Sequence, residues 1–284
     1  MAALGQRNLL AVVREAPPGL YLDGGNLGEI LLPNRYITQG VGPGDQLDVF
    51  VYLDSEDRLV ATTEQPYVKV GGFALLQVVS LKPGVGAFLD WGLSKDLLLP
   101  MREQVRRVRN GEWVVAAVAI DPRSGRIYAS TRLDRHLDRT PASYKVGQAV
   151  DLLVAEQTRL GFKAIIEGAH WGLLYQGEMA SPLAIGQRLQ GFIRTIRLDG
   201  KIDLSLDQSG YQRVAPLTDE ILDALKANAG RLEFNDQSSP EAIRETFGVS
   251  KKAFKQAVGA LLRQRQIRFE GDGIELLVRE SIRD

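Results

Sequence analysis

The chain has 284 residues, 44% of them apolar, and its 35 Lys and Arg balance 35 Asp and Glu. Its length and apolar content indicate a core-forming chain of several domains, and a net charge of zero lacks the basic excess of many nucleic-acid-binding domains. The absence of Cys excludes disulfides and zinc knuckles. With no apolar run long enough for a membrane helix and no signal-peptide pattern, we expect a cytoplasmic protein without a membrane partner.

The N-terminal half of the chain repeats itself. Residues 19–33 align without gaps on residues 86–100, with identities that include Gly19 and Gly86 and the closing Leu-Leu-Pro. A weaker third copy begins near Val146, and residues 161–166 occupy its equivalent of the strand that begins at Gly86. Repetition at this period indicates an array of similar small domains.

Within each copy the pattern is that of short β-strands. In the second copy the apolar runs bounded by Gly, Pro or Asp are Phe73–Ser80, Gly86–Asp90, Asp96–Leu99, Trp113–Ile120 and Arg126–Thr131. Such runs, with Gly-containing hairpin turns at 121–125 and 198–200, are typical of antiparallel strands. Five short strands in about 65 residues predict a small OB-type barrel.

The C-terminal part changes to helical periodicity. Thr218 is predicted to cap one helix, Ser239 with Pro240 a second, and Ser250 a third that runs from Lys251 to about Gln264. A hairpin around residues 271–272 follows. Helices followed by a two-stranded wing predict a winged helix-turn-helix.

The fold class is therefore mainly β with a C-terminal α/β part. We expect three tandem five-stranded OB barrels at residues 1–65, 66–140 and 145–212, followed by a winged helix domain at 216–284.

The second repeat resembles the S1 RNA-binding domain. It carries that family's Gly-Ala-Phe strand at 86–88, the Gly-Glu step at 111–112 and the closing hairpin at 121–130. Three S1-like units followed by a winged helix are similar to the bacterial conserved virulence factor B family. This resemblance implies a non-enzymatic protein that binds single-stranded RNA and regulates gene expression.

The resemblance also implies roles for individual residues. In S1 domains strand aromatics stack on unpaired bases, and a basic residue of the last hairpin meets phosphate. Phe88 and Tyr21 occupy the aromatic position, and Arg126 and Lys201 the basic one. The family's strand histidine is absent, because Leu99 stands there in the second repeat.

Charge is unevenly distributed between the repeats. Residues 1–65 hold 4 basic and 9 acidic side chains, whereas residues 66–145 hold 13 basic and 7 acidic ones. A net charge of +6 attracts a polyanion and one of −5 repels it. We therefore expect RNA on the second barrel.

Further candidates follow from this assignment. Exposed cations can neutralise phosphates, and the candidates in the second repeat are Lys82, Arg102, Arg106, Arg107, Arg109 and Arg123. Because strand side chains alternate, Leu89 inside the barrel predicts Phe88 outside, where a base can reach it. Trp91 and Phe73 are the neighbouring aromatic candidates.

The winged helix offers a second basic surface. Lys251, Lys252 and Lys255 lie in the first turns of the predicted recognition helix, where such folds contact a nucleic-acid groove. Since a helix N-terminus favours acids, three lysines there indicate a polyanionic partner, possible ones being DNA or structured RNA. The alternative is a solvated face of a protein-binding winged helix.

Two other functions compete with RNA binding. A protein–protein adaptor could use the acidic first barrel and the winged helix. A nuclease would need a carboxylate or histidine cluster, and the two histidines, His136 and His170, are far apart in sequence. We therefore expect no catalytic residues, no metal and no cofactor; the sequence leaves the oligomeric state open.

Overall fold

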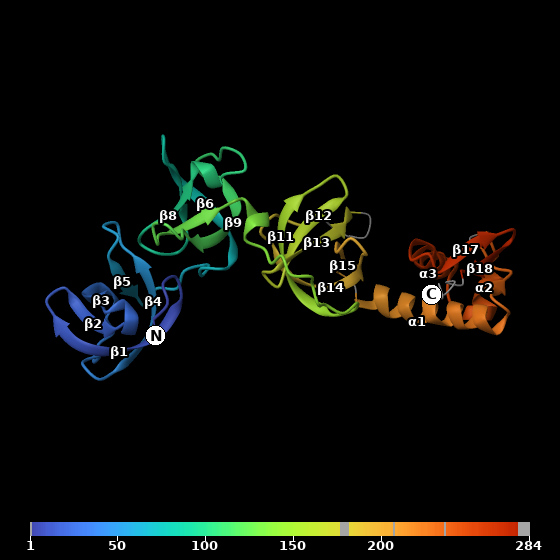
Figure 1. Cartoon of the computed structure of the whole chain (residues 1–284), viewed down its shortest axis with the longest axis horizontal. Helices are drawn as coiled ribbons and strands as arrows, with labels where there is room; N and C mark the ends of the chain where they lie inside the picture. Colours follow the sequence, from blue (N-terminus) through green and yellow to red (C-terminus); the bar gives the residue numbers. More distant parts are fainter. Residues whose placement is uncertain (1, 177–181, 207, 236, 278–284) are drawn as a thin grey trace, which may run out of the picture. The chain divides into compact units, whose positions relative to one another are not determined.

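The computed structural model describes residues 2–176, 182–206, 208–235 and 237–277. It confirms the predicted class: three closed or nearly closed five-stranded barrels are followed by a winged helix domain (Figure 1). By their internal contacts the residues form two compact units, one of residues 1–142 and 150–190 and the other of residues 143–149 and 191–284.

The first barrel has the OB strand order. Its strands are β1 (Arg7–Ala16), β2 (Gly19–Asp23), β3 (Glu29–Pro33), β4 (Gln46–Leu53) and β5 (Leu59–Thr62). They close in the order β1-β2-β3-β5-β4, with a parallel contact of β3 and β5 at Leu31 and Val60. Alternation decides which side chains fill the interior: Leu20 and Leu22 are buried, and Tyr21 between them faces outward.

The second and third barrels repeat this plan. Their strands are β6 (Phe73–Lys82), β7 (Gly86–Asp90), β8 (Leu97–Pro100), β9 (Trp113–Ile120), β10 (Ile127–Ser130), β11 (Ala149–Gln157), β12 (Gly161–Ile166), β13 (His170–Tyr175), β14 (Arg188–Ile196) and β15 (Ile202–Ser205). Short 3-10 turns lie at η1 (Gly25–Leu27), η2 (Asn34–Tyr36), η3 (Met101–Glu103) and η4 (Leu133–Arg135). The first strand of each barrel has a register shift at the same place, which adds the curvature that closure needs.

One glycine position is physically required in all three barrels. Gly19, Gly86 and Gly161 begin the second strand of each barrel with φ of +150°, +157° and +149°. A Cβ on Gly86 would lie 2.2 Å from the carbonyl oxygen of Leu99 on the neighbouring strand, and the other two glycines meet the same obstacle. The repeated glycine therefore permits the close pairing of the second and third strands.

The C-terminal domain has the predicted winged-helix order. Its elements are α1 (Gln208–Ala227), β16 (Arg231–Leu232), α2 (Pro240–Phe247), α3 (Lys251–Arg263), β17 (Ile267–Glu270) and β18 (Gly273–Leu276). The hydroxyls of Ser239 and Ser250 cap α2 and α3 as predicted, and Gly248 ends α2 in the left-handed conformation. Phe247 and Phe254 pack together in the core, 5.2 Å apart.

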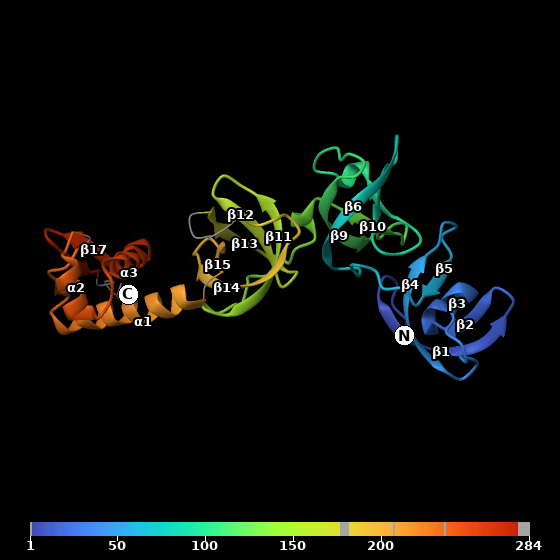
Figure 2. The same cartoon turned by 180° about the vertical axis from the view of Figure 1, so that it is seen from behind.

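The predicted start of the first helix was wrong. The helix α1 begins at Gln208, ten residues before the expected cap Thr218, and leads from β15 into the winged helix (Figure 2). Its apolar stripe includes Leu217, which is buried together with Ile221 and Leu225 at helical spacing. Leu217, the residue before Thr218, already belongs to this stripe, so Thr218 lies inside the helix and does not cap it. The expected domain boundary at 212–216 falls within α1.

Candidate nucleic-acid interface

Phe88 lies on the outer face of the second barrel. On β7 its neighbours Ala87 and Leu89 are completely buried, whereas Phe88 is partly exposed. It pairs with Ser80 on β6 and with Leu98 on β8. The orientation expected from alternation is thus present, and base contact by this ring remains a prediction.

The equivalent ring of the first barrel is covered. Tyr21 pairs with Arg14, whose guanidinium carbon lies 3.8 Å from the centre of the Tyr21 ring. Glu29 accepts a 2.6 Å hydrogen bond from Arg14, which lowers the pKa of the Glu29 carboxyl and raises the pKa of Arg14. A base could stack on this face of Tyr21 only by displacing the cation.

The equivalent position of the third barrel is occupied in another way. Lys163 pairs with Glu156, and their side chains form a 3.2 Å ion pair. The Lys163 ammonium also lies 3.9 Å from the centre of the Trp171 ring. This site therefore presents a neutralised cation in place of an open aromatic ring.

The second barrel differs from both at this register. The residue opposite Phe88 is Ser80, which has no charge and too short a side chain to cover a ring. In the part of the chain that the structure describes, no cation or aromatic ring contacts Phe88. Phe88 is thus partly exposed and is covered by neither a charged nor an aromatic side chain among these residues.

The segment between β8 and β9 carries four of the candidate arginines, Arg102, Arg106, Arg107 and Arg109. Glu112 shapes the segment, because its carboxylate pairs with the Arg106 guanidinium and accepts a 2.9 Å hydrogen bond from the backbone N–H of Arg109. The bond from Arg106 lowers the pKa of Glu112. Arg107 and Arg109 are exposed; among the described residues the Arg107 guanidinium has no partner, and the charge of Arg109 contributes to lowering the pKa of Glu112 without forming an ion pair with it. Of these arginines, Arg107 and Arg109 are therefore held less tightly than Arg106.

The hairpin between β9 and β10 is organised by Asp121. Its carboxylate accepts hydrogen bonds from the backbone N–H of Arg123, at 2.8 Å, and from the Arg102 guanidinium, at 2.6 Å. Hydrogen bonds from the backbone, the first from Arg123, lower the pKa of Asp121. Arg102 is thus held by an acid, whereas the Arg123 and Lys82 side chains are exposed without a partner among the residues described.

The two hairpin cations expected at phosphate are both paired. Arg126 forms an ion pair with Asp57, which belongs to the first barrel, and Lys201 forms one of 2.7 Å with Asp199. These groups are exposed, so the pairs are weak and could be exchanged for phosphate. Phosphate contact by Arg126 and Lys201 remains a prediction.

The expectation for Trp91 was wrong. Its side chain is only 2% exposed, and the indole Nε1 donates a 2.6 Å hydrogen bond to the carbonyl of Lys95. The ring meets Phe50 of the first barrel edge-on, with centroids 5.7 Å apart. Trp91 is part of the core that joins the first two barrels and cannot stack on a base.

The expectation for Phe73 was also wrong. Phe73 faces outward from the second barrel, but it is 4% exposed because it packs in one apolar cluster with Leu153 and Ile165 of the third barrel. Alternation predicts which face a side chain occupies. It does not predict that another domain covers that face.

Trp113 is an aromatic candidate that sequence reasoning missed. It is the first residue of β9 and is 56% exposed. Because Val114 after it is buried in the barrel, alternation could have placed Trp113 outside. Trp113 was not predicted because it begins the apolar run Trp113–Ile120, which is typical of a buried strand.

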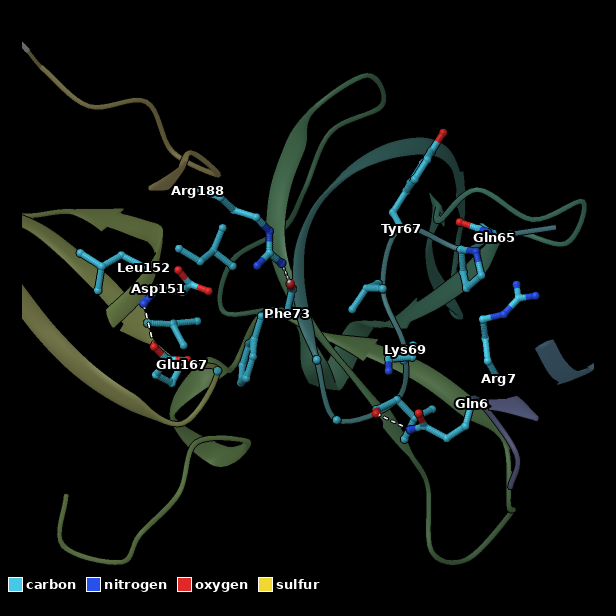
Figure 3. A pocket seen from close by; sticks show the side chains of 18 residues that line it. Gln6, Arg7, Gln65, Tyr67, Lys69, Phe73, Asp151, Leu152, Glu167 and Arg188 are labelled. Carbon is cyan, nitrogen blue, oxygen red and sulfur yellow. Dashed lines mark hydrogen bonds between the residues drawn. The ribbon is translucent and has the colours of Figure 1, made fainter. Parts of the chain in front are cut away.

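A cleft lies elsewhere, between the linker that joins the first two barrels and residues of the third barrel. It has a volume of about 720 Å³, and its walls carry cations such as Lys69 and acids such as Glu167 (Figure 3). Gln6 donates a 2.8 Å hydrogen bond to the carbonyl of Val70, and Arg188 donates one of 2.5 Å to the carbonyl of Phe73. These polar groups fix the linker, and the mixed charge of the walls does not favour a polyanion.

The three lysines of the winged helix lie where they were expected, on the first turns of α3. Lys252 and Lys255 are exposed, and Lys251 donates a 3.3 Å hydrogen bond to the carbonyl of Gln237. Nucleic-acid contact by this group remains a prediction.

No helix among the described residues has the length and apolarity to cross a membrane. In the same residues, no three His, Asp or Glu side chains are grouped so that they could hold a metal ion.

Comparison with known families gives the class of the chain. The S1 domain family matches residues 4–64, and the CvfB-like winged helix domain family matches residues 219–276. S1 domains and winged helices are nucleic-acid-binding modules, so these matches support a nucleic-acid-binding protein. The fold and the matches together define a class with tandem S1-like barrels and a CvfB-like winged helix.

Bacterial proteins are similar to this chain over most of its length. The chain is 28% identical to the protein YitL of Bacillus subtilis over 93% of its own length and 90% of that protein. It is 24% identical to conserved virulence factor B of Staphylococcus aureus, over 82% and 80% of the two chains. A crystal structure of a multidomain protein with nucleic acid binding domains from Streptococcus pneumoniae aligns over 96% of this chain and 98% of its own, with 23% identity and a TM-score of 0.41. The chain is a homologue of YitL and conserved virulence factor B, as the sequence predicted.

Proposed function

We propose that this protein binds single-stranded RNA through the outer face of its second barrel and regulates gene expression without catalysis, in the cytoplasm. Bases would stack on Phe88, and phosphates would meet exposed cations of the same barrel, such as Arg107, Arg109 and Arg123. Stacking together with charge neutralisation is the usual way to hold an unpaired strand.

The observation that carries this proposal is the open ring of Phe88. At the same register the first barrel covers Tyr21 with a guanidinium, and the third barrel has Lys163 paired with Glu156. The open ring also belongs to the most basic of the three repeats. Two independent features, one steric and one electrostatic, thus favour the same barrel.

The winged helix is proposed as an auxiliary contact. Linking two weakly binding modules in one chain raises the overall affinity through effective concentration. Lys252 and Lys255 would then contact phosphates of the same RNA or of a duplex region beside it.

A salt titration of RNA binding by the full chain tests the proposal. For a single strand, the slope of log K against log salt is about −0.7 for each phosphate neutralised. Substituting Arg107 and Arg109 by Ala should therefore flatten the slope by up to about 1.4. Arg106→Ala is the matched control, because Glu112 already neutralises Arg106, and it should change the slope less.

Two outcomes would overturn the proposal. No binding of single-stranded RNA at low salt would favour the adaptor, in which the acidic first barrel meets a basic protein. Loss of intact labelled RNA during long incubation with Mg²⁺ or Mn²⁺ would show a nuclease.

A further inference from the structure

We propose that Trp113 is a second base-stacking platform, which makes the outer face of the second barrel a site for more than one base. This inference rests on the proposed function and extends it. It adds a residue that lies outside the aromatic and hairpin positions from which the S1-like site was predicted.

The strand register places Trp113 on the same face as Phe88. Trp113 pairs with Gln77 on β6, and Gln77 pairs with Asp90 on β7. Phe88 lies two residues before Asp90 on the same strand, so its side chain points to the same side. All four side chains are at least partly exposed, as outward-facing residues should be.

The spacing of the two rings suits separate bases. Trp113 and Phe88 are two strand spacings apart across the sheet and two residues apart along it, which corresponds to about 12 Å between their Cα atoms. Among the described residues the two rings form no aromatic contact with each other, so each can receive its own base.

Only part of the outer face of the second barrel is covered by the third barrel, and Phe88 and Trp113 both lie outside the covered part. Farther along β6 and β9, the outward side chains Phe73 and Val115 are buried in the cluster shared with the third barrel. Trp113 lies beyond that cluster and is 56% exposed. The exposed part of the face thus has one aromatic ring on β7 and another on β9.

The indole N–H of Trp113 is a further indication of an external partner. Trp91 donates its indole N–H to the carbonyl of Lys95, and Trp171 donates its own to the carboxylate of Asp134, both at 2.6 Å. Within the described residues the Trp113 indole has no such acceptor. A donor beside an exposed ring suits a ligand that offers both a planar face and polar atoms.

Cations lie next to the same ring in the chain. Arg107 and Arg109 precede Trp113 by six and four residues, and the chain turns between them at Gly111, which has φ of +77°. The backbone N–H of Gly111 donates a 2.7 Å hydrogen bond to the carbonyl of Val78, which fixes this turn on the barrel. Phosphates of a base stacked on Trp113 would find the exposed guanidinium groups of Arg107 and Arg109 in the adjoining segment.

Trp113 provides its own spectroscopic test. The full chain is titrated with dodecameric oligouridylate and oligoadenylate while tryptophan emission and its quenching by acrylamide are recorded. Binding should quench the emission and shield it from acrylamide. Both changes should be lost in Trp113→Phe and retained in Trp171→Phe, the matched control, whose ring is already covered by Lys163.

Affinity gives the second measurement. Trp113→Ala should weaken binding about 5- to 150-fold, the range for loss of one base stack. The exposed site makes misfolding of this variant a minor concern, and thermal unfolding checks it. The inference would be overturned if Trp113→Ala bound RNA as tightly as the unaltered chain and RNA left the tryptophan emission of the unaltered chain unchanged. If Phe88→Ala still weakened binding, the proposed function would stand. No RNA binding by the unaltered chain would overturn both.

Discussion

The difference between Phe88 and Tyr21 gives a prediction with a built-in control. Phe88→Ala should weaken binding of single-stranded RNA by about 1–3 kcal/mol, or about 5- to 150-fold, because one base loses its stacking surface. Tyr21→Ala changes the equivalent position of the first barrel. There the ring already holds the Arg14 guanidinium, a contact of about 0.5–1 kcal/mol that a base must displace. Tyr21→Ala should therefore reduce the affinity for single-stranded RNA by less than about twofold.

Fluorescence anisotropy of labelled RNA with the full chain measures both affinities under one salt condition. Thermal unfolding is the control for folding, and both variants should unfold near the unaltered chain because both rings lie on outer faces. Equal losses for the two variants would refute the reasoning that an open ring distinguishes the second barrel. A larger loss for Tyr21→Ala would move the site to the first barrel.

Three further predictions concern single residues. Gly86→Ala should cost roughly 2–4 kcal/mol in urea unfolding because its Cβ meets backbone, whereas Gly84→Ala, in open space at φ of +76°, should cost only about 1–2 kcal/mol; similar costs would contradict the role given to Gly86. Asp57→Asn should strengthen RNA binding by freeing Arg126, with little change in melting temperature, and weaker binding would count against it. Burial lowers the pKa of His136 below its ordinary 6.5, so the free energy of unfolding is highest above about pH 6.5 and falls as the pH drops toward the lower pKa of the folded state. Urea unfolding should show this decline, and His136→Gln should reduce it. Identical pH profiles of the two proteins would refute the prediction.

The fold was accessible from the sequence because its determinants are local. Glycine at positions such as Gly86 and Gly125 marks strand starts and hairpin turns, and the apolar runs between them match strands within one or two residues. Ser239 and Ser250 predicted helix starts through side-chain caps that are present. The start of α1 was missed although Asp207, a residue type common at helix N-caps, directly precedes Gln208, because Thr218 offered a second cap-forming residue ten positions later.

Site residues could be predicted from the sequence only where the pattern of a single strand was enough to orient the side chain. Alternation around Leu89 was enough to orient Phe88. The predictions for Phe73 and Trp91 were wrong because residues far away in the sequence, such as Ile165 and Phe50, cover these side chains. No local pattern reports which distant domain will lie on a given face.

Pairing of charges was also beyond the sequence. The partner of Arg126 is Asp57, on a hairpin of another barrel, 69 residues earlier. Composition gives the net charge of a repeat, whereas the structure shows which cations form ion pairs. Arg107 and Arg109 stand out from the larger basic set because, among the described residues, neither forms one.

Photo-crosslinking tests the central claim most directly. Single-stranded RNA containing 4-thiouridine is bound to the full chain, irradiated and digested, and the crosslinked peptides are identified by mass spectrometry. We predict crosslinks on the second barrel, in the peptides that contain Phe88 and Trp113, with additional ones from α3 of the winged helix. Crosslinks confined to the first barrel or to the winged helix would contradict the account.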